Sequence, residues 1–402
     1  MGFRMYDVAV VGAGPAGATT ARYLAMTGLN VCMIDKDQFP RDKACGGGFS
    51  LSLVDDFPYL KNRQSEFLKG VCRVGVLHSP NMKRTLKGRV DMAVALRTDF
   101  DNVLFELAEE AGAKPLVGKR VKSVTFSEDN VEVAITGGQF LSARVVVGAD
   151  GVTSIVAREA GLNKKWRSGS ITACRVAEIP ATEKQIVDSY TEDHEYHFFA
   201  NVGGLPGYGW VFPKKETINV GLGIVDKHSA GLPKRFQLFI QMLKRNGKLG
   251  SDVDLSATRG ALIPTGGPLK YTTGNRCVLV GDSAGMVNPL TGGGIAYAMN
   301  AGRIAAATLK ECIENDSLDE ENLKAYHNGW KSDFGHEFRP QLMAQRFFTG
   351  SFASALFEIG SRDTHLQETV TSIMSEGSGG RIGFLRLLGR FLFVCVREAL
   401  RL

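Results

Sequence analysis

The first 35 residues contain two apolar runs separated by a stretch of small residues. Residues 6–11 and 31–34 are largely apolar and rich in β-branched side chains, which favours strands, and the small side chains of residues 15–25 favour a tightly packed helix. The first run stops at Gly12-Ala13-Gly14-Pro15-Ala16-Gly17, and the second ends in Asp35. This order predicts a βαβ unit that binds a dinucleotide.

Each glycine of this turn has a separate role in a dinucleotide site. Gly12 would allow the tight turn, Gly14 would let backbone N–H groups approach a pyrophosphate, and Gly17 would let the helix and the strand pack closely. Asp35, 18 residues beyond Gly17, is placed to accept hydrogen bonds from a ribose. The alternative is a glycine-rich turn in an ordinary α/β protein.

Residues 97–113 follow the i, i+3, i+4, i+7 spacing of an amphipathic helix. Thr98 or Asp99 can cap this helix, and Gly112 can end it. Arg97 precedes the predicted cap, where its side chain could reach a diphosphate. A surface salt bridge is the alternative role for Arg97.

Short apolar runs at residues 121–126, 131–135 and 143–147 predict a meander that leads back to the parallel sheet. The last run ends in Gly148-Ala149-Asp150-Gly151, and a later buried strand ends in Gly281-Asp282-Ser283. Turns at the carboxyl ends of buried strands are where an α/β sheet contacts its ligand. Residues 288–294 are glycine-rich and lead into a small-residue helix at 295–308, whose N-terminus would present unpaired N–H groups and a positive dipole end.

The pattern changes between residues 169 and 257. Strands are predicted at residues 170–179, 195–201, 208–213 and 217–225, with turn signals between them. One of them reads Tyr208-Gly209-Trp210-Val211-Phe212-Pro213, and strand alternation places Tyr208, Trp210 and Phe212 on one face. These rings form either an aromatic core stripe or an apolar wall over a ligand.

Together these elements predict an α/β protein, α+β overall, with three regions. A Rossmann-like nucleotide-binding domain is expected at residues 1–70, 93–168 and 258–317. An inserted antiparallel-sheet substrate domain takes residues 71–92 and 169–257. A helical region at 318–402 shows no strand signals and ends in a basic segment.

Composition narrows the class of protein. A chain of 402 residues with 44% hydrophobic content can bury a sizeable core. Its seven cysteines are scattered, odd in number and contain no C-x-x-C pair, which argues against a disulfide framework and a metal site. The first strand begins by about the sixth residue, which leaves no room for a signal peptide, and no apolar run approaches the roughly 18 residues of a spanning helix. We therefore expect a protein of the reducing cytoplasm.

The net charge of +6 is concentrated at the C-terminus. The rest of the chain is nearly balanced in charge, so we expect no nucleic-acid partner. At about 100° per residue, Arg386, Arg390, Arg397 and Arg401 share one helix face, and apolar side chains cover the other. Such a helix would either contact the inner face of the cell membrane peripherally or pack on the body of the protein.

Taken in order, the motifs resemble the flavoprotein group of para-hydroxybenzoate hydroxylase, over roughly the first 310 residues. The resemblance rests on Gly12 to Gly17, Arg97, Gly148 to Gly151, and Gly281 to Ser283 followed by Pro289 and Gly292 to Gly294. Within this group the chain resembles the geranylgeranyl reductase family. Two motifs carry that narrower match: Ala44-Cys45-Gly46-Gly47-Gly48, and the aromatic sequence from Tyr208 to Pro213.

The resemblance implies that the nucleotide is FAD, and it assigns roles. Gly12, Gly14 and Gly17 would hold the pyrophosphate, Asp35 the adenosine ribose, Arg97 the diphosphate region, Asp282 the ribityl chain, and Gly292 and Gly293 the flavin pyrimidine ring. Further cofactor contacts are implied for Ala16, Lys36, Ala44, Cys45, Gly46, Gly47, Val121, Asp150, Gly281, Pro289, Gly294 and Ile295. Cys45, Tyr208, Trp210 and Phe212 are the candidate catalytic residues, with Cys45 at the flavin face. Asp35 replaces the more usual Glu, whose side chain is one methylene longer.

The implied reaction is saturation of isolated C=C bonds in a geranylgeranyl chain on a lipid, by hydride from reduced flavin N5 plus a proton. The partners would be an isoprenoid lipid and an external electron donor such as ferredoxin or NAD(P)H, because no second nucleotide-binding fold is visible. The lipid could be a phospholipid, a free diphosphate, a chlorophyll ester or a quinone tail. The alternatives are a flavin-dependent monooxygenase or halogenase acting on a small aromatic, and an electron-transfer flavoprotein serving a membrane quinone. The lack of cluster-forming cysteines weakens the last of these.

Overall fold

The apolar run at the start of the chain forms β1 (Met5–Val11), an inner strand of a largely parallel sheet in this computed structural model. The structure describes residues 5–350, 353–376 and 389–394. In β1, Val8 lies opposite Val31 of one neighbouring strand and Val145 of the other, and all three side chains are fully buried. Because helices or strands cover both faces, the run is apolar throughout rather than alternating.

This first sheet has the strand order β15-β16-β9-β1-β2-β6, and β8 and β7 extend it from β9. β1, β2, β6, β9 and β16 are parallel, as the βαβ prediction requires. The predicted meander is confirmed as the antiparallel strands β7, β8 and β9. The strand bounds are β2 (Val31–Ile34), β6 (Lys114–Leu116), β7 (Val121–Phe126), β8 (Val131–Ile135), β9 (Gln139–Gly148), β15 (Thr273–Gly274) and β16 (Cys277–Leu279).

The second sheet has the order β14-β10-β13-β12-β11-β4-β5-β3. It confirms the predicted antiparallel sheet, with one difference: β4 and β11 are parallel. It also extends past the ranges 71–92 and 169–257, because β3 and β14 join its two edges. The strand bounds are β3 (Gly48–Ser50), β4 (Leu68–His78), β5 (Thr85–Ala95), β10 (Thr172–Pro180), β11 (Tyr196–Ala200), β12 (Gly207–Pro213), β13 (Thr217–Val225) and β14 (Arg259–Ile263).

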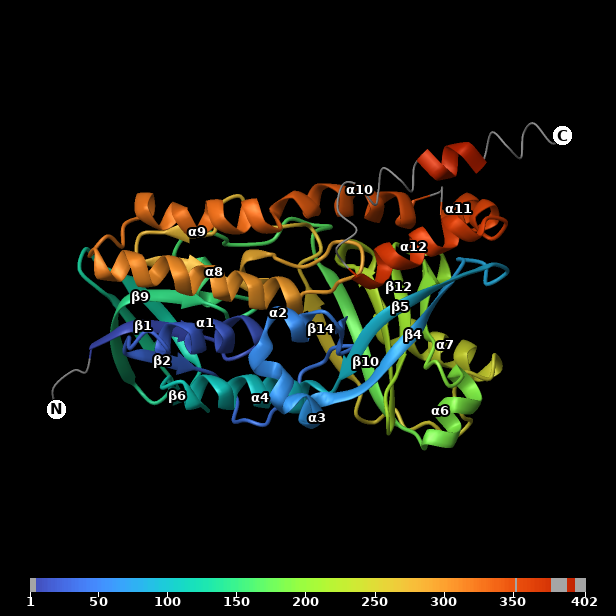
Figure 1. Cartoon of the computed structure of the whole chain (residues 1–402), viewed down its shortest axis with the longest axis horizontal. Helices are drawn as coiled ribbons and strands as arrows, with labels where there is room; N and C mark the ends of the chain where they lie inside the picture. Colours follow the sequence, from blue (N-terminus) through green and yellow to red (C-terminus); the bar gives the residue numbers. More distant parts are fainter. Residues whose placement is uncertain (1–4, 351–352, 377–388, 395–402) are drawn as a thin grey trace.

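Helices pack against both sheets, and α9 and α10 follow one another along one side of the molecule (Figure 1). The prediction that the chain is helical after Leu318 is confirmed for the described residues. The helix bounds are α1 (Pro15–Ala25), α2 (Leu53–Asp56), α3 (Gln64–Phe67), α4 (Arg97–Glu110), α5 (Ile155–Glu159), α6 (Glu183–Tyr190), α7 (Leu232–Arg245), α8 (Ile295–Glu314), α9 (Glu320–Asp333), α10 (Phe338–Thr349), α11 (Ala353–Gly360) and α12 (Thr364–Glu376).

The start of α4 differs from the sequence prediction. Leu96 is the N-cap residue and makes no side-chain cap, so Thr98 and Asp99 already lie in the first turn. Asp99 instead forms an ion pair with Lys69, in which Oδ2 of the aspartate lies 2.7 Å from Nζ of the lysine. Arg97 is therefore the first helical residue, and it lies one turn from Asp101.

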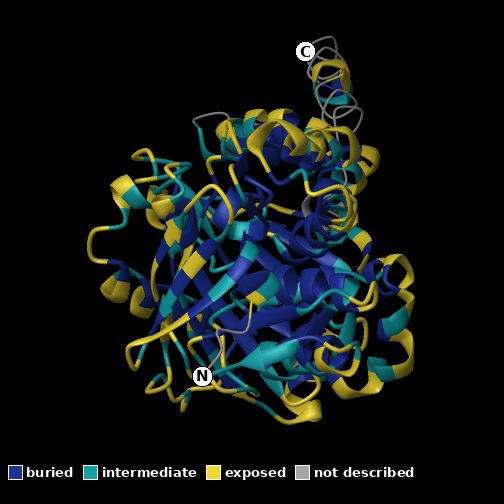
Figure 2. Ribbon diagram, turned by 90° about the vertical axis from the view of Figure 1, so that its left-hand side faces the viewer, coloured by how far each residue is buried: buried dark blue, intermediate teal, exposed yellow. Residues whose placement is uncertain are grey.

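Buried residues fill the space between the layers (Figure 2), and α1 and α8 approach each other closely there. A Cβ at Gly302 of α8 would lie 2.8 Å from the carbonyl oxygen of Ala16 and 2.8 Å from Thr20 Oγ1. Only glycine permits this contact without a shift of the two helices. The contact fixes α8 beside α1.

Two neighbouring histidines, the half-buried His78 and the buried His197, lie where β4 and β11 run parallel. His78 Nε2 and His197 Nδ1 are 2.8 Å apart, and the ring of Phe199 stacks on His78 at 4.3 Å. Burial, together with the nearby Lys248 ammonium, lowers the pKa of His78 to about 4 and that of His197 to about 2. Both rings are therefore neutral in the folded protein at neutral pH.

This pair predicts a loss of stability in mild acid. The unfolded chain takes up protons on both rings below its histidine pKa of about 6.5, whereas the folded chain does not, so stability falls as the pH drops from 6.5 toward the folded values. We expect each ring to remove up to about 2 kcal/mol from the free energy of unfolding between about pH 7.5 and about pH 5, measured by urea titration. A His78→Phe/His197→Phe variant should lack most of this dependence, and the exposed His228→Asn should keep it. An unchanged pH dependence in the double variant would contradict the assignment.

The predicted basic helix at the C-terminus lies mostly outside the described residues. Of residues 389–394, Arg390 pairs with Asp363 at 2.7 Å and Val394 is buried, whereas Leu392 and Phe393 are 60% and 55% exposed. Arg390 is thus engaged with the body of the protein. Among the described helices, none combines the length and apolar character needed to span a membrane.

Candidate active site

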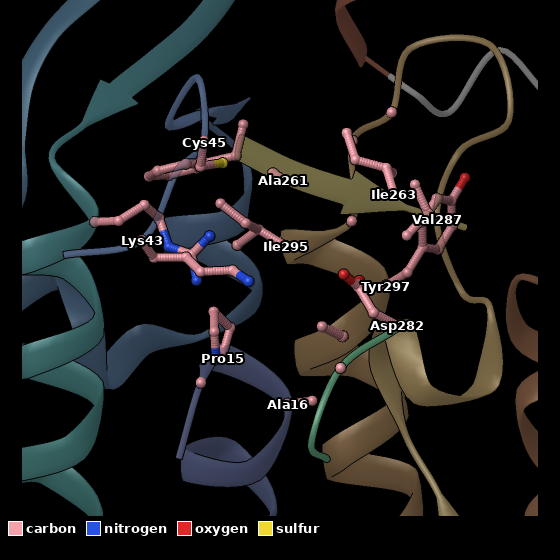
Figure 3. A pocket seen from close by; sticks show the side chains of 18 of the residues that line it. Pro15, Ala16, Lys43, Cys45, Ala261, Ile263, Asp282, Val287, Ile295 and Tyr297 are labelled. Carbon is pink, nitrogen blue, oxygen red and sulfur yellow. The ribbon is translucent and has the colours of Figure 1, made fainter. Parts of the chain in front are cut away.

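One cavity of about 980 Å³ lies where the two sheets meet. The α1 turn, the loop at residues 41–48, the N-terminus of α8 and the faces of β10, β12 and β14 form its walls. Figure 3 shows Lys43 and Cys45 on one side, Asp282 and Tyr297 on the other, and Ile263 on β14 near the far end. Segments more than 200 residues apart in the sequence therefore share one cavity.

In the glycine turn before α1, backbone segments lie too close together for any side chain at Gly12 or Gly17. Gly12 has φ +99°, and a Cβ there would lie 2.3 Å from the carbonyl oxygen of Ala149; a Cβ at Gly17 would lie 1.8 Å from the carbonyl oxygen of Gly12. Gly14 is the N-cap residue of α1 and provides no side-chain cap. The first N–H groups of α1 therefore lie beside the cavity without a side-chain partner, as an anion site at a helix N-terminus requires.

A cluster of cations lies next to this turn. Arg97 binds the fully buried Asp101 through Nε and Nη2, at 2.6 and 2.8 Å, and Arg41 Nη2 lies 2.9 Å from the same carboxylate. Lys43 extends into the cavity, and enclosure by the protein, with Arg97 nearby, lowers the pKa of its ammonium. One carboxylate thus holds two guanidinium groups, and the cluster keeps an excess of positive charge at the cavity wall.

Asp35 and Asp150, two of the carboxylates predicted to contact FAD, accept hydrogen bonds from other groups of the protein. Asp35 Oδ2 accepts a hydrogen bond from the N–H of Ala13 at 2.8 Å, so this shorter acidic side chain braces the glycine turn. Asp150 accepts hydrogen bonds from Ser154 Oγ at 2.5 Å and from the N–H of Ile155 at 2.7 Å, and thereby binds the start of α5. Burial raises the pKa of Asp150. Both residues line the cavity, and their predicted contacts to FAD remain predictions.

The N-terminus of α8 opens on the cavity from the opposite side. Gly292 has φ +71°, and Gly294 is the N-cap residue with no side-chain cap. The Tyr208 hydroxyl donates a hydrogen bond to the carbonyl of Thr291, which ties the aromatic strand to this turn. Burial raises the pKa of Asp282, and Lys43 and Arg97 oppose that rise.

The prediction that Tyr208, Trp210 and Phe212 share a face is confirmed. Their neighbouring ring centroids lie 5.7 and 6.4 Å apart, and all three line the cavity. The indole of Trp210 lies across the backbone of β13, where a Cβ at Gly221 would be 1.9 Å from Cζ2. The rings belong both to a buried cluster and to the cavity wall, so the core stripe and the apolar wall are the same feature.

The loop that carries Cys45 lies on this aromatic wall. A Cβ at Gly46 would lie 2.6 Å from Phe212 Cε2 and 3.2 Å from Trp210 Nε1. Cys45 Sγ accepts a hydrogen bond from the N–H of Gly47 at 3.3 Å. Cys45 is the one cysteine among the described residues that is not buried.

All but three of the predicted cofactor and catalytic residues line the cavity. The exceptions are Gly17, Gly281 and Pro289, which lie behind the residues that line the cavity. Gly17 packs on the Gly12 carbonyl, and a Cβ at Gly281 would contact Ala16. The Pro289 carbonyl accepts a hydrogen bond from Gln345. The predicted residues that do line the cavity are Gly12, Gly14, Ala16, Asp35, Lys36, Ala44, Cys45, Gly46, Gly47, Arg97, Val121, Asp150, Tyr208, Trp210, Phe212, Asp282, Gly292, Gly293, Gly294 and Ile295.

The sequence prediction missed several cavity residues. Arg41 and Lys43 precede Cys45 in its loop, so two cations next to a glycine run were a visible signal. Phe198 of β11 and Cys174 of β10 line the apolar wall without any such signal, because only strand pairing brings them there. Within the described part of the chain, no cluster of His, Cys, Asp or Glu could hold a metal ion.

These features fit FAD. Two helix N-termini without side-chain caps, α1 and α8, suit the pyrophosphate and an electron-rich flavin ring, and Lys43, Arg41 and Arg97 supply positive charge beside the first. Glycines at positions 12 and 46–48 let the α1 turn and the cysteine loop pack tightly at the cavity wall, because a Cβ there would lie 3.1 Å or less from other protein atoms. The apolar wall faces this polar half across a single cavity.

Comparison with known proteins agrees with this fit. Residues 5–331 match the family of FAD binding domains. The digeranylgeranylglycerophospholipid reductase of Methanocaldococcus jannaschii is 32% identical over 335 residues, which cover 81% of this chain and 82% of that protein.

Two solved structures share the fold of this chain. A geranylgeranyl bacteriochlorophyll reductase-like protein of Thermoplasma acidophilum superimposes with a TM-score of 0.81 at 25% identity, covering 97% of this chain and all of that one. A halogenase in complex with FAD superimposes with a TM-score of 0.70 at 18% identity, covering 95% of this chain and 85% of that one, and shares the fold. The chain belongs to the geranylgeranyl reductase family of FAD-dependent oxidoreductases.

Proposed function

We propose that this protein saturates isolated C=C bonds in the isoprenoid chains of a lipid. The observation that carries the proposal is the apolar wall of Tyr208, Trp210 and Phe212, which faces the predicted FAD residues across one cavity. Relatives named as reductases of a geranylgeranyl lipid support it. Phe198 of β11 and Phe49 of β3 line the same cavity and add to its aromatic surface.

The protein's own part in the reaction would be to position the alkene chain and to exclude water from the cavity. An isolated alkene has no carbonyl group to polarise it, so orientation must supply much of the acceleration, and well-oriented systems gain up to roughly 7–11 kcal/mol from this source. The aromatic wall would hold the chain and exclude water, and Lys43, Arg41 and Arg97 would hold the diphosphate of FAD. The chemistry that FAD would supply when bound and reduced by an external donor is a hydride for one alkene carbon, and a proton would complete the other. Cys45 lies at the cavity side of its loop, where it would position the substrate or take part in proton delivery.

The test is a single-turnover reduction without oxygen. The FAD-loaded protein is reduced with dithionite, mixed with a geranylgeranyl lipid, and the products are analysed by mass spectrometry. We expect a gain of two hydrogens for each saturated double bond, and no product from protein lacking FAD. No mass gain with a phospholipid, a free diphosphate, a chlorophyll ester or a quinone would refute the proposal.

The same preparation tests the alternative functions. A monooxygenase or halogenase would consume oxygen and NAD(P)H in the presence of a small aromatic, and an electron-transfer flavoprotein would reduce a quinone without changing its tail. Because the resemblance to a halogenase extends only to the fold, the alkene reaction is the proposal that we retain.

A further inference from the structure

A row of polar residues crosses the second sheet beside the aromatic wall. In the strand register, Asn219 of β13 lies opposite Glu178 of β10 and Phe212 of β12. Residues opposite each other on paired strands project to the same face. Glu178 and Asn219 therefore lie on the face that carries Trp210 and Phe212.

The Asn219 side chain joins the two parts of the candidate active site. Its Nδ2 donates hydrogen bonds to the Cys45 carbonyl at 3.0 Å and to Glu178 Oε2 at 2.7 Å, and its Oδ1 accepts one from Trp210 Nε1 at 2.8 Å. A reversed amide would set oxygen against two acceptors and nitrogen against the indole N–H. These contacts therefore select one orientation, and Asn219 itself is only 1% exposed.

An ion pair between the half-buried Glu178 and a buried lysine fixes the glutamate in turn. Lys214 Nζ lies 2.8 Å from Glu178 Oε2, and the lysine side chain is 2% exposed. Thr217 Oγ1 donates to Glu178 Oε1 at 2.5 Å. A buried cation is costly unless it is paired, so the carboxylate is held on the lysine.

The lysine lies directly beneath the cysteine loop. A Cβ at Gly47 would be 3.4 Å from Lys214 Nζ and 2.0 Å from the carbonyl oxygen of Ala95. The loop is thus packed against the sheet from Gly46 to Gly48, with Lys214, Asn219 and the rings below it.

We propose that Asn219, oriented by the Glu178–Lys214 ion pair, is a positioning residue that fixes Cys45 relative to Trp210. The inference rests on the proposed function for its catalytic consequence, since the spacing between the cysteine loop and the aromatic wall would set the width of the substrate slot. Neither Asn219 nor Glu178 transfers a proton in this role. Their effect is on geometry alone.

The test uses Asn219→Ala in the full-length, FAD-loaded protein. Iodoacetamide labelling of Cys45, followed by peptide mass spectrometry, reports how firmly the loop is held without requiring turnover. Loss of the bonds to the loop should speed labelling by about tenfold, and it should lower kcat for lipid reduction by about tenfold while KM changes far less. Thr172→Val is the matched control, because it removes a buried hydrogen bond to Thr265 at the other end of β10, and it should change neither rate.

Asn219→Asp provides a second variant should the alanine variant not fold. It keeps the shape of the side chain but places an acceptor against the Cys45 carbonyl and Glu178, so it should release the loop in the same way. Labelling at the wild-type rate in whichever variant folds would overturn the inference. If the wild-type protein reduces no lipid, the proposed function fails, while the labelling comparison still decides whether Asn219 positions Cys45.

Discussion

Gly221→Ala should lower the rate of lipid reduction by about 100-fold, because displacing a reacting group's support by about 1 Å costs that much in well-oriented reactions. A Cβ at this position would lie 1.9 Å from Trp210 Cζ2 and 2.2 Å from Cε2, so the indole must move off β13. That movement would also break the bond from Trp210 Nε1 to Asn219. The rate is measured as saturated product formed by the reduced protein, and FAD content, measured by absorbance, should be unchanged.

Two further variants show whether the ring is the cause. Gly250→Ala adds the same methyl group where no atom lies within 4 Å, and it should leave the rate unchanged. Gly221→Ala/Trp210→Phe replaces the indole with a smaller ring and should recover part of the lost activity relative to Gly221→Ala. Full activity in Gly221→Ala would show that the substrate does not lie against this wall.

Arg97→Met should remove most of the bound FAD and destabilise the protein. Asp101 is fully buried, and Arg97 binds it through two hydrogen bonds. Loss of one partner of a buried ion pair costs about 3–5 kcal/mol, and we expect about 3 kcal/mol here because Arg41 remains 2.9 Å from the same carboxylate. FAD content and the free energy of unfolding by urea are the two measurements.

The double variant Arg97→Met/Asp101→Leu separates the two roles of Arg97. Removing the buried carboxylate as well should restore much of the stability, since an apolar replacement of a buried ion pair is often neutral. FAD content should stay low, because the positive charge beside the α1 turn is still missing. Restored FAD content would instead mean that Arg97 only neutralises Asp101. Arg158→Met, at an exposed pair with Glu159, is the control and should change neither measurement.

Much of the fold follows from local patterns. The buried run of β1, the glycine turn and the small residues of α1 identified the βαβ unit, because the period of apolar positions depends only on neighbouring residues. The same reasoning placed Tyr208, Trp210 and Phe212 on one face. The local pattern predicted the wrong cap at the start of α4, because Asp99 pairs with Lys69 of β4 instead of capping the helix.

The sequence by itself thus determined the nucleotide-binding unit, most of the strands and the face that carries the aromatic rings. Only the tertiary structure decided what those rings and cations contact: Asn219 reaches Cys45 across 174 positions, and Asp101 holds Arg41. It also decided that Gly221 leaves room for the Trp210 indole. The physical reason is that strand order and register arise from hydrogen bonding between distant segments, whereas alternation along a strand fixes only which side each residue faces.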